Sequence, residues 1–448
     1  MTTVPAWPEP IRSRLDNGLE VVCVPLEHLH LTSIILFVRV GSRFETASEN
    51  GLSHLLEHVL FRGCEAYPDT YALNSAIETI GTGLDAATSR DFTTFEATCL
   101  PERAGEMLAI MGQMISRPLL TGVDVERRII TEELQDEIDA KGKDVDVDNL
   151  AKMKLFPAQG LGLKVGGTLA RIGRFEAEDC RRWYDRHYTG QNMALAVTGP
   201  LDPAAIHAAA AAAFGSRPPG ERLDTHVPRP RVDLPAMEYT RHSGSQVDLE
   251  ITWTLPPEDH PDWAALLLVQ RLLDDGTCAR LRHRVVDQLG LAYHAGADLE
   301  VYDRVSLLTI GSQTRPNQVV PLIDAMLETL DQLGSEPVPA GELERMRSRL
   351  ALELGSVVDS PSSTAYWFGL ERLYPAADSL GRRHMRAMAV TPDEIQAAVR
   401  AHLDRRKAQL TVVGDLDPVE RATLRRRLHA ASSASTSGAV SNPAADPI

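Results

Sequence analysis

The second half of this chain repeats the pattern of its first half. The segment Val197-Thr-Gly-Pro-Leu-Asp-Pro203 matches Val412-Val-Gly-Asp-Leu-Asp-Pro418 at an offset of 215 residues. The acidic pair Glu178-Asp179 matches Asp393-Glu394 at the same offset. Each copy spans roughly 200 residues, which is enough for a domain with its own core. The duplication therefore predicts two domains of one fold.

Both copies mix strand patterns with helix patterns. Asp16-Asn17-Gly18 stands between two apolar runs and predicts a hairpin, because Asn-Gly supplies the positive φ angles of a type I′ turn. The alternating run Phe92 to Leu100 predicts a strand and has a counterpart at Val305 to Gly311. Helices are expected at Pro101 to Ser116 and from Val123 to about Phe156. This mixture predicts an α/β fold for each copy.

Composition shifts divide the chain into four segments. Residues 216–235 carry five prolines and many charges without apolar periodicity, which predicts an extended linker. The last residues, 431–448, are rich in Ser, Ala and Pro and are expected to be disordered. We therefore expect an N-terminal domain at 1–215 and a homologous C-terminal domain at 236–430.

The overall charge and the cysteines restrict the partners and the compartment. A formal net charge of −16, without a stripe of Lys and Arg, argues against nucleic acid and anionic membranes as partners. Apolar runs stay below the roughly 18 residues of a membrane span, and the first residues lack the pattern of a signal peptide. The five scattered cysteines indicate reduced thiols. A cytoplasmic protein is expected.

One short stretch carries the pattern of a metal site. In His54-Leu-Leu-Glu57-His58 the two histidines lie one helical turn apart on one face, so both imidazoles can reach a single ion. Zn²⁺ accepts imidazole and carboxylate ligands and keeps a position for water, whose pKa it lowers. Glu57 is adjacent and could act as general base. The pattern therefore predicts a hydrolytic zinc site.

A third ligand is expected from an acidic helix further along the chain. Glu126 and Glu133 are seven residues apart and so share a helix face. By spacing alone, Glu132 and Glu137 are also candidates.

The order of these motifs resembles a known family. H-x-x-E-H, followed about 75 residues later by Glu133 at the end of an E-x6-E pattern, is similar to the inverted zinc motif of the pitrilysin, insulysin and mitochondrial-processing-peptidase family. Val40-Gly-Ser-Arg-Phe-Glu45 also resembles the short bacterial and the mitochondrial members. The resemblance implies that His54, His58 and Glu133 bind Zn²⁺ and that Glu126 supports the site from outside.

The resemblance covers nearly the whole chain up to the tail and implies its architecture. It implies an α/β fold of the α+β sandwich type, with two homologous domains arranged as a clam shell. Each domain would hold a mixed, mostly antiparallel sheet with helices on one face. Aligning the copies on Gly63 and Gly276 puts Leu267 and Arg271 opposite the two histidines. One zinc ion per chain is therefore expected.

Substrate binding is expected at a strand that comes after the helix carrying His54 and His58. The residues assigned to it are Asp85, Ala86, Ala87 and Thr88, where an extended peptide could add as a further strand. The family usually has Asn-Ala where this chain has Asp85-Ala86, which adds a negative charge near the substrate.

The second copy departs from the family at one catalytic position. The family commonly places an Arg seven residues before a Tyr that reaches the substrate. Here Tyr293 is present, but Val286 stands at the Arg position. On an ideal α-helix neither Arg282 nor Arg284 could replace it. The resemblance therefore implies a zinc-bearing subunit that works with a homologous partner in a heterodimer, with a homodimer as the alternative.

Together these features predict a zinc endopeptidase that cleaves peptides or unstructured protein segments. Glu57 would be the general base, and Glu126 and Tyr293 would assist. The alternative is a non-catalytic scaffold subunit of the same family.

Overall fold

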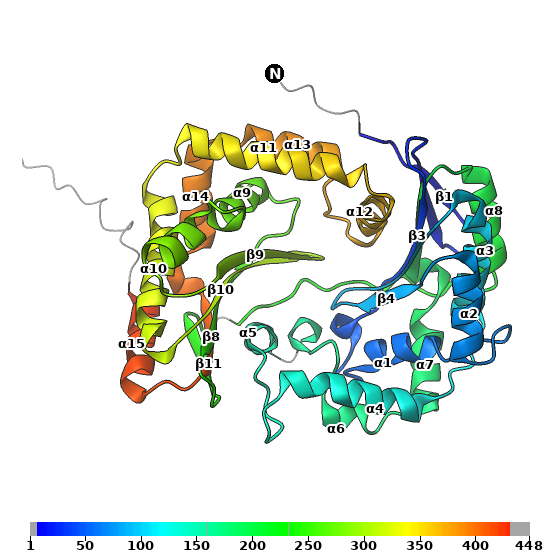
Figure 1. Ribbon diagram of the computed structural model, residues 1–448, viewed down its shortest axis with the longest axis horizontal. Helices are drawn as coiled ribbons and strands as arrows, with labels where there is room; N and C mark the ends of the chain where they lie inside the picture. The colour runs from blue at the N-terminus through cyan, green and yellow to red at the C-terminus, as the bar shows by residue number, and fades with distance from the viewer. Residues whose placement is uncertain (1–6, 158, 232, 431–448) are drawn as a thin grey trace, which may run out of the picture.

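The computed structural model describes residues 7–157, 159–231 and 233–430. Two sheets, one from each half of the chain, form its frame (Figure 1). The first half contributes β1 (Ile11–Arg14), β2 (Glu20–Pro25), β3 (Thr32–Val38), β4 (Asp85–Thr88), β5 (Thr93–Cys99), β6 (Met193–Gly199), α1 (Leu52–Leu60), α2 (Thr70–Ile80), α3 (Ala104–Ser116), α4 (Val123–Glu133), α5 (Val147–Leu155), α6 (Leu169–Ile172), α7 (Ala177–His187) and α8 (Pro203–Phe214). The second half contributes β7 (Ala236–Arg241), β8 (Val247–Leu255), β9 (Ala295–Tyr302), β10 (Val305–Thr314), β11 (Gln409–Gly414), α9 (Trp263–Asp274), α10 (Val319–Ser335), α11 (Ala340–Val357), α12 (Pro361–Leu373), α13 (Leu380–Ala389), α14 (Pro392–His402), α15 (Pro418–His429) and the π-helical turn η6 (Arg282–Gln288).

The two sheets have the same topology. The first runs β1-β2-β6-β3-β5-β4 and the second runs β7-β11-β8-β10-β9, so they match strand for strand once the hairpin strand β1 is set aside. In each sheet, the matched strands that come first and last along the chain lie side by side and pair in parallel: β2 with β6, and β7 with β11. The other pairs of neighbouring strands are antiparallel. The prediction of two α/β domains with mixed sheets is confirmed.

Each half packs its own helices on the outer face of its sheet. In Figure 1, α3 and α8 lie outside the first sheet, and α10, α14 and α15 lie outside the second. A large cluster of buried apolar side chains fills the space between sheet and helices in each half. Burial of these side chains is the main stabilising contribution to each domain.

The inner face of each sheet receives one helix from the other half. α12 packs on β3 and β6 of the first sheet, and α5 packs on β8 and β11 of the second. Gly369 of α12 allows the close approach, because a Cβ atom there would lie 2.1 Å from the ring of Phe37 on β3. The two helices occupy equivalent places in the duplicated pattern, so the halves are interlocked by a reciprocal exchange that the sequence did not predict.

One predicted helix is wrong in extent. The segment from Val123 to about Phe156 is not a single helix: α4 ends at Glu133, and α5 begins at Val147. Between them Gly142 has a φ of 75°, and the Asp139 carboxylate accepts hydrogen bonds from the backbone N–H groups of Lys141 and Lys143. A left-handed glycine and an Asp-centred turn interrupt the helical hydrogen bonding.

The segment between the halves contains no helix or strand from residue 216 to 235 among its described residues. We propose 1–215 and 236–430 as the domain boundaries on this basis and on the sheet topology. The tail expected at 431–448 lies outside the described residues. None of the helices in the described part of the chain combines the length and apolar character that crossing a membrane requires.

The exchanged helix α5 generates a prediction about pH. Glu250 of β8 lies in an acidic neighbourhood with Asp146 and Asp148 of the α5 region, and its Oε2 is buried without a hydrogen-bond partner among the described residues. Burial, followed by the charge of Asp148, raises the pKa of Glu250 to about 8. In the folded protein the Glu250 carboxyl therefore keeps its proton up to about pH 8. In the unfolded chain the same carboxyl releases its proton above its usual pKa of 4.5.

We expect stability to fall as pH rises between those two pKa values, because ionising Glu250 in the fold is unfavourable. Glu250→Gln should flatten this dependence and stabilise the protein by on the order of a few kcal/mol at high pH. Urea unfolding of both proteins at pH 6 and pH 9 measures it. Identical pH dependence of the two proteins would contradict the assignment.

Candidate metal centre

The helix α1 that carries the H-x-x-E-H motif is held at its start by a buried carboxylate. Glu45 accepts hydrogen bonds from the backbone N–H groups of Gly51 and Ser53, both at 2.8 Å, and from the Asn50 side chain at 2.9 Å. These groups would otherwise be unsatisfied at a helix N-terminus, where a negative charge is also favourable. The apolar face of α1 is buried in the core of the first half and consists of Leu52, Leu55, Leu56, Val59 and Leu60. Glu45 and this face together fix the position of α1.

A glycine-rich loop packs against the same end of α1. At Gly167, where φ is 75°, a Cβ atom would lie 2.7 Å from the carbonyl oxygen of Asn50 and 2.8 Å from Cα of Gly51. This close backbone approach requires glycine at position 167. Neither Glu45 nor this loop was predicted from the sequence as a support of the site, and the cluster of glycines is the sequence signal for the loop.

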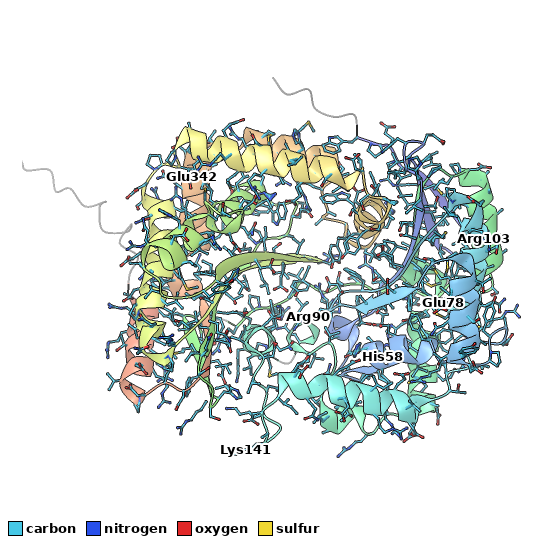
Figure 2. The ribbon with its side chains drawn as sticks, viewed as in Figure 1. His58, Glu78, Arg90, Arg103, Lys141 and Glu342 are labelled. Atoms are coloured by element: carbon cyan, nitrogen blue, oxygen red, sulfur yellow. The ribbon has the colours of Figure 1, made fainter. Side chains whose placement is uncertain are left out.

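Three predicted ligands meet beside α1. The Nε2 atoms of His54 and His58 are 3.2 Å apart, and Oε2 of Glu133 on α4 lies 3.9 and 3.8 Å from them. Figure 2 shows His58 on α1 above α4. Donors bound at about 2.0–2.1 Å to one tetrahedral zinc ion lie about 3.3–3.5 Å from one another. The spacing of the three donors is therefore close to that of a zinc site, and the residues fit the ion.

The imidazoles are prepared for binding a cation through Nε2. His58 Nδ1 donates to Glu126 at 3.0 Å, which leaves its Nε2 lone pair free, and Glu126 also pairs with Arg62. Burial, together with the neighbouring His58, lowers the pKa of His54 to about 4, so this imidazole is neutral at pH 7. For His58 burial acts in the same direction, but the hydrogen bond with Glu126 and the charge of Glu133 outweigh it and raise the pKa.

Glu57 lies beside the ligands and is linked to the edge of the sheet. Its side chain is buried, and burial, with the nearby charge of Glu133, raises its pKa above the ordinary value. Thr88 of β4 donates to Oε2 of Glu57 at 2.6 Å. β4 is the last strand of the first sheet, with Asp85 and Ala87 exposed and Ala86 and Thr88 half-buried. Thr88 thus connects the predicted base to the predicted substrate strand, a link the sequence did not reveal.

The structure separates Glu133 from the other acidic candidates. Glu132 is exposed and does not join the two histidines. Glu137 forms an ion pair with Lys164 at 2.7 Å. Glu126 and Glu133 do share a face of α4, the first reaching His58 Nδ1 and the second facing the Nε2 atoms.

The predicted residues of the second half do not contact the three ligands. Tyr293 is 95% exposed and lines a cavity of about 1020 Å³ in the second half. Val286 is half-buried and packs against the core of that half. Residues 282–288 form a π-helix, so the assumption of an ideal α-helix was wrong, and Arg284 is held by Glu328 of α10 at 3.2 Å. Arg284 is therefore engaged elsewhere, and Arg282 of the same turn is exposed.

The equivalent place in the second half holds an ion pair. Arg271 of α9 aligns with His58, and its Nη1 donates to Glu353 of α11 at 2.9 Å and lies 3.2 Å from Asp275. A guanidinium cation thus stands where the first half has its imidazoles. A separate group, His260, Asp262 and His402, also brings potential metal ligands together, with His402 Nε2 2.8 Å from Asp262.

Comparison with known proteins agrees with this geometry. Residues 21–168 match the insulinase family of peptidases, M16, and residues 174–350 match the domain described as the M16 inactive domain. The chain belongs to the M16 peptidase family. An uncharacterized zinc protease of Streptomyces coelicolor is 26% identical over 427 residues, covering 90% of this chain and 89% of the relative. The mitochondrial-processing peptidase subunit beta of Caenorhabditis elegans is 25% identical over 426 residues, covering 91% and 90%.

Solved structures show the same M16 fold. A protease from Helicobacter pylori superposes with a TM-score of 0.84 at 18% identity, covering 92% of this chain and all of the other. A chain of complex III2 from Candida albicans superposes with a TM-score of 0.75 at 16% identity, covering 90% and 95%.

The cap on α1 gives a testable prediction. Glu45→Ala leaves two backbone donors and one side-chain donor without their buried acceptor, and we expect it to lower the free energy of unfolding by about 1–3 kcal/mol. Glu45→Gln keeps an acceptor oxygen and should restore part of the loss. Chemical denaturation of the three proteins measures the effect. Equal stability of wild type and Glu45→Ala would show that the cap is not required.

Proposed function

We propose that this M16 family member is a zinc-dependent endopeptidase that cleaves peptides or unstructured protein segments. The observation that carries the proposal is the convergence of His54, His58 and Glu133 within 3.2–3.9 Å of one another. The buried carboxylate of Glu57 stands beside them. Relatives of this chain are named as zinc proteases, which supports zinc-dependent peptide hydrolysis.

Each residue has a distinct role in this proposal. His54, His58 and Glu133 hold one Zn²⁺ per chain, and Glu126 orients His58. The bound ion would polarise the scissile carbonyl and acidify water. Glu57 accepts the proton of the attacking water through Oε1, because Thr88 occupies Oε2, and passes it to the leaving amine. The raised pKa of Glu57 suits a group that must both accept and donate a proton near neutral pH.

The substrate is proposed to extend the first sheet at β4. The backbone of Asp85 to Thr88 lies at the end of the sheet, so an extended peptide can pair with it and lie next to Glu57. Main-chain pairing requires an extended peptide, which favours unstructured segments over folded proteins.

Two substitutions test the assignment of roles. Glu57→Gln should keep the metal and lower kcat by at least about 100-fold, because it removes the base and leaves the ligands. Glu133→Gln should instead lower zinc affinity, because a ligand loses its charge. Metal analysis and peptide hydrolysis are measured on each purified variant. Full activity of Glu57→Gln, or the absence of zinc from the wild type, would overturn the proposal; absent zinc would favour a non-catalytic scaffold.

We further propose that the chain acts with a homologous partner. Relatives in this family occur as subunits of larger assemblies, including a mitochondrial-processing peptidase subunit and a chain of complex III2. The Val286 side chain cannot donate a hydrogen bond to a substrate, and Tyr293 is 95% exposed and has no contact with the three ligands among the described residues. A heterodimer in which the partner supplies these donors fits both facts, and a homodimer is the alternative.

The isolated chain should hydrolyse an unstructured peptide slowly even with zinc supplied, because one or two donors are missing, each contributing about 2.7–4 kcal/mol in comparable sites. Peptide cleavage by the chain alone, and by the chain with Tyr293→Phe, measures this. Rapid turnover that is lost in Tyr293→Phe would show that its own second half suffices and would rule out the heterodimer.

A further inference from the structure

A cavity of about 200 Å³ lies where the first half, the connecting segment and α12 of the second half meet. A single water needs about 15 Å³ of such volume, so the cavity has room for a small polyatomic ion. Its charged lining comes from all three parts of the chain: Arg14, Glu20, Arg39, Arg222 and Arg372.

The charges around this cavity do not balance. Four arginines and one carboxylate, Glu20, line the cavity, and Glu20 is shared between Arg14 and Arg372. Asp303, outside this lining, approaches Arg39. Burial raises the pKa of Glu20, but its bonds to Arg372 and Arg14 outweigh burial and lower it, so Glu20 is ionised. A chain with a net charge of −16 thus concentrates positive charge here. Such a concentration favours an anion.

Arg39 is the buried member of the group. Its side chain is 5% exposed, and its Nη1 reaches Asp303 only at 3.4 Å. Its Nη2 is buried without a hydrogen-bond partner among the described residues. A buried, unpaired donor on a charged group is costly unless another group satisfies it. Burial, and then the nearby charge of Arg222, lowers the pKa of Arg39, although Asp303 and Asp91 act in the opposite direction.

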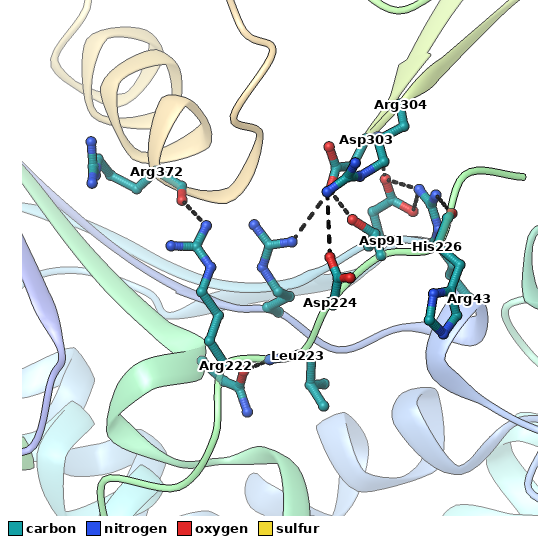
Figure 3. Close-up of polar contacts among 12 residues, drawn as sticks. Arg43, Asp91, Arg222, Leu223, Asp224, His226, Asp303, Arg304 and Arg372 are labelled. Atoms are coloured by element: carbon teal, nitrogen blue, oxygen red, sulfur yellow. Dashed lines mark hydrogen bonds and ion pairs between the residues drawn. The ribbon is translucent and has the colours of Figure 1, made fainter.

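Arg222 lies on the solvent side of the group. It is exposed, and its Nη2 donates to the backbone carbonyl of Arg372 at 3.1 Å, as Figure 3 shows. No carboxylate lies within 4.0 Å of Arg222 in the described part of the chain, whereas its neighbour Asp224 pairs with Arg304. Arg222 therefore keeps donors for a ligand.

We propose that this cavity binds a phosphate group, held by Arg39, Arg222 and Arg372. Arginine presents several N–H donors in a plane that matches phosphate oxygens, and each such bond is charge-assisted. The ligand satisfies Arg39 Nη2 and screens the repulsion between Arg39 and Arg222. Because the three arginines come from the end of β3, where Arg39 follows Val38, from the connecting segment and from α12, phosphate also joins the two halves. This site is separate from the metal ligands and does not depend on the proposed peptidase activity.

Titration calorimetry of the full chain with inorganic phosphate, at constant chloride concentration, tests the site. We expect saturable binding that Arg222→Gln weakens by about tenfold or more, since one charge-assisted interaction is lost. The matched control is Arg345→Gln on α11: Arg345 is also exposed and donates to a backbone carbonyl, that of Gly341 at 3.4 Å. The Arg345→Gln variant should bind phosphate with the same affinity as the wild type.

Two results would overturn the proposal. The first is that titrating phosphate into the wild-type protein gives no saturable heat of binding. This would mean that water and Asp303 alone satisfy the donors of the arginine group. The second is equal binding by wild type and Arg222→Gln, which would place phosphate elsewhere, such as at a bound metal. Circular dichroism confirms that the variants are folded.

The source of the phosphate group is decided by two further titrations of the same proteins. Adenosine monophosphate that binds more tightly than phosphate, and loses affinity in Arg222→Gln, would identify a phosphorylated metabolite as the ligand. Weaker binding of the nucleotide than of inorganic phosphate would identify the free ion. Adenosine, which lacks the phosphate, should not bind at this site in either case.

Discussion

The reciprocal exchange of α5 and α12 is the interaction on which the rest of this structure depends. Each helix packs on the inner face of the opposite sheet and buries side chains that neither half could cover alone. The contact is close enough that Gly369 cannot carry a side chain against Phe37. Two domains joined only by a linker would be free to reorient. Here the exchange fixes their relative position.

Polar contacts reinforce this arrangement at the same junction. Arg39 of the first half reaches Asp303 in the turn between β9 and β10, whose backbone N–H donates to Asp91 at 2.7 Å. Asp91 in turn pairs with Arg43, next to the segment that leads into Glu45 and α1. A continuous set of contacts therefore runs from the domain junction to the start of α1. The proposed phosphate site lies at one end of it.

The two copies differ at the place of the candidate metal ligands. In the first copy, α1 presents two imidazoles towards a carboxylate of α4, with an outer carboxylate on His58. In the second copy, Arg271 of α9 fills the same place and satisfies the acidic residues with its own charge. A permanent cation leaves no requirement for a metal there. The two copies thus share their architecture and differ at the positions of the candidate ligands.

The sequence by itself determined the duplication and the α/β class, and it predicted the helix of His54 and His58 and the three candidate ligands. These depend on local spacing: His54 and His58 face one way because a helix turns every 3.6 residues, and the copies match because homologous segments fold alike. Spacing alone allowed Glu132, Glu133 or Glu137 as the third ligand, and the family resemblance selected Glu133. The structure brings Glu133 to the two histidines. Only the tertiary structure decided where α4 ends, that Thr88 holds Glu57, that Glu45 caps α1, and that α5 and α12 exchange partners. These features join residues far apart in sequence, and their geometry is set by packing between elements, which no local pattern encodes.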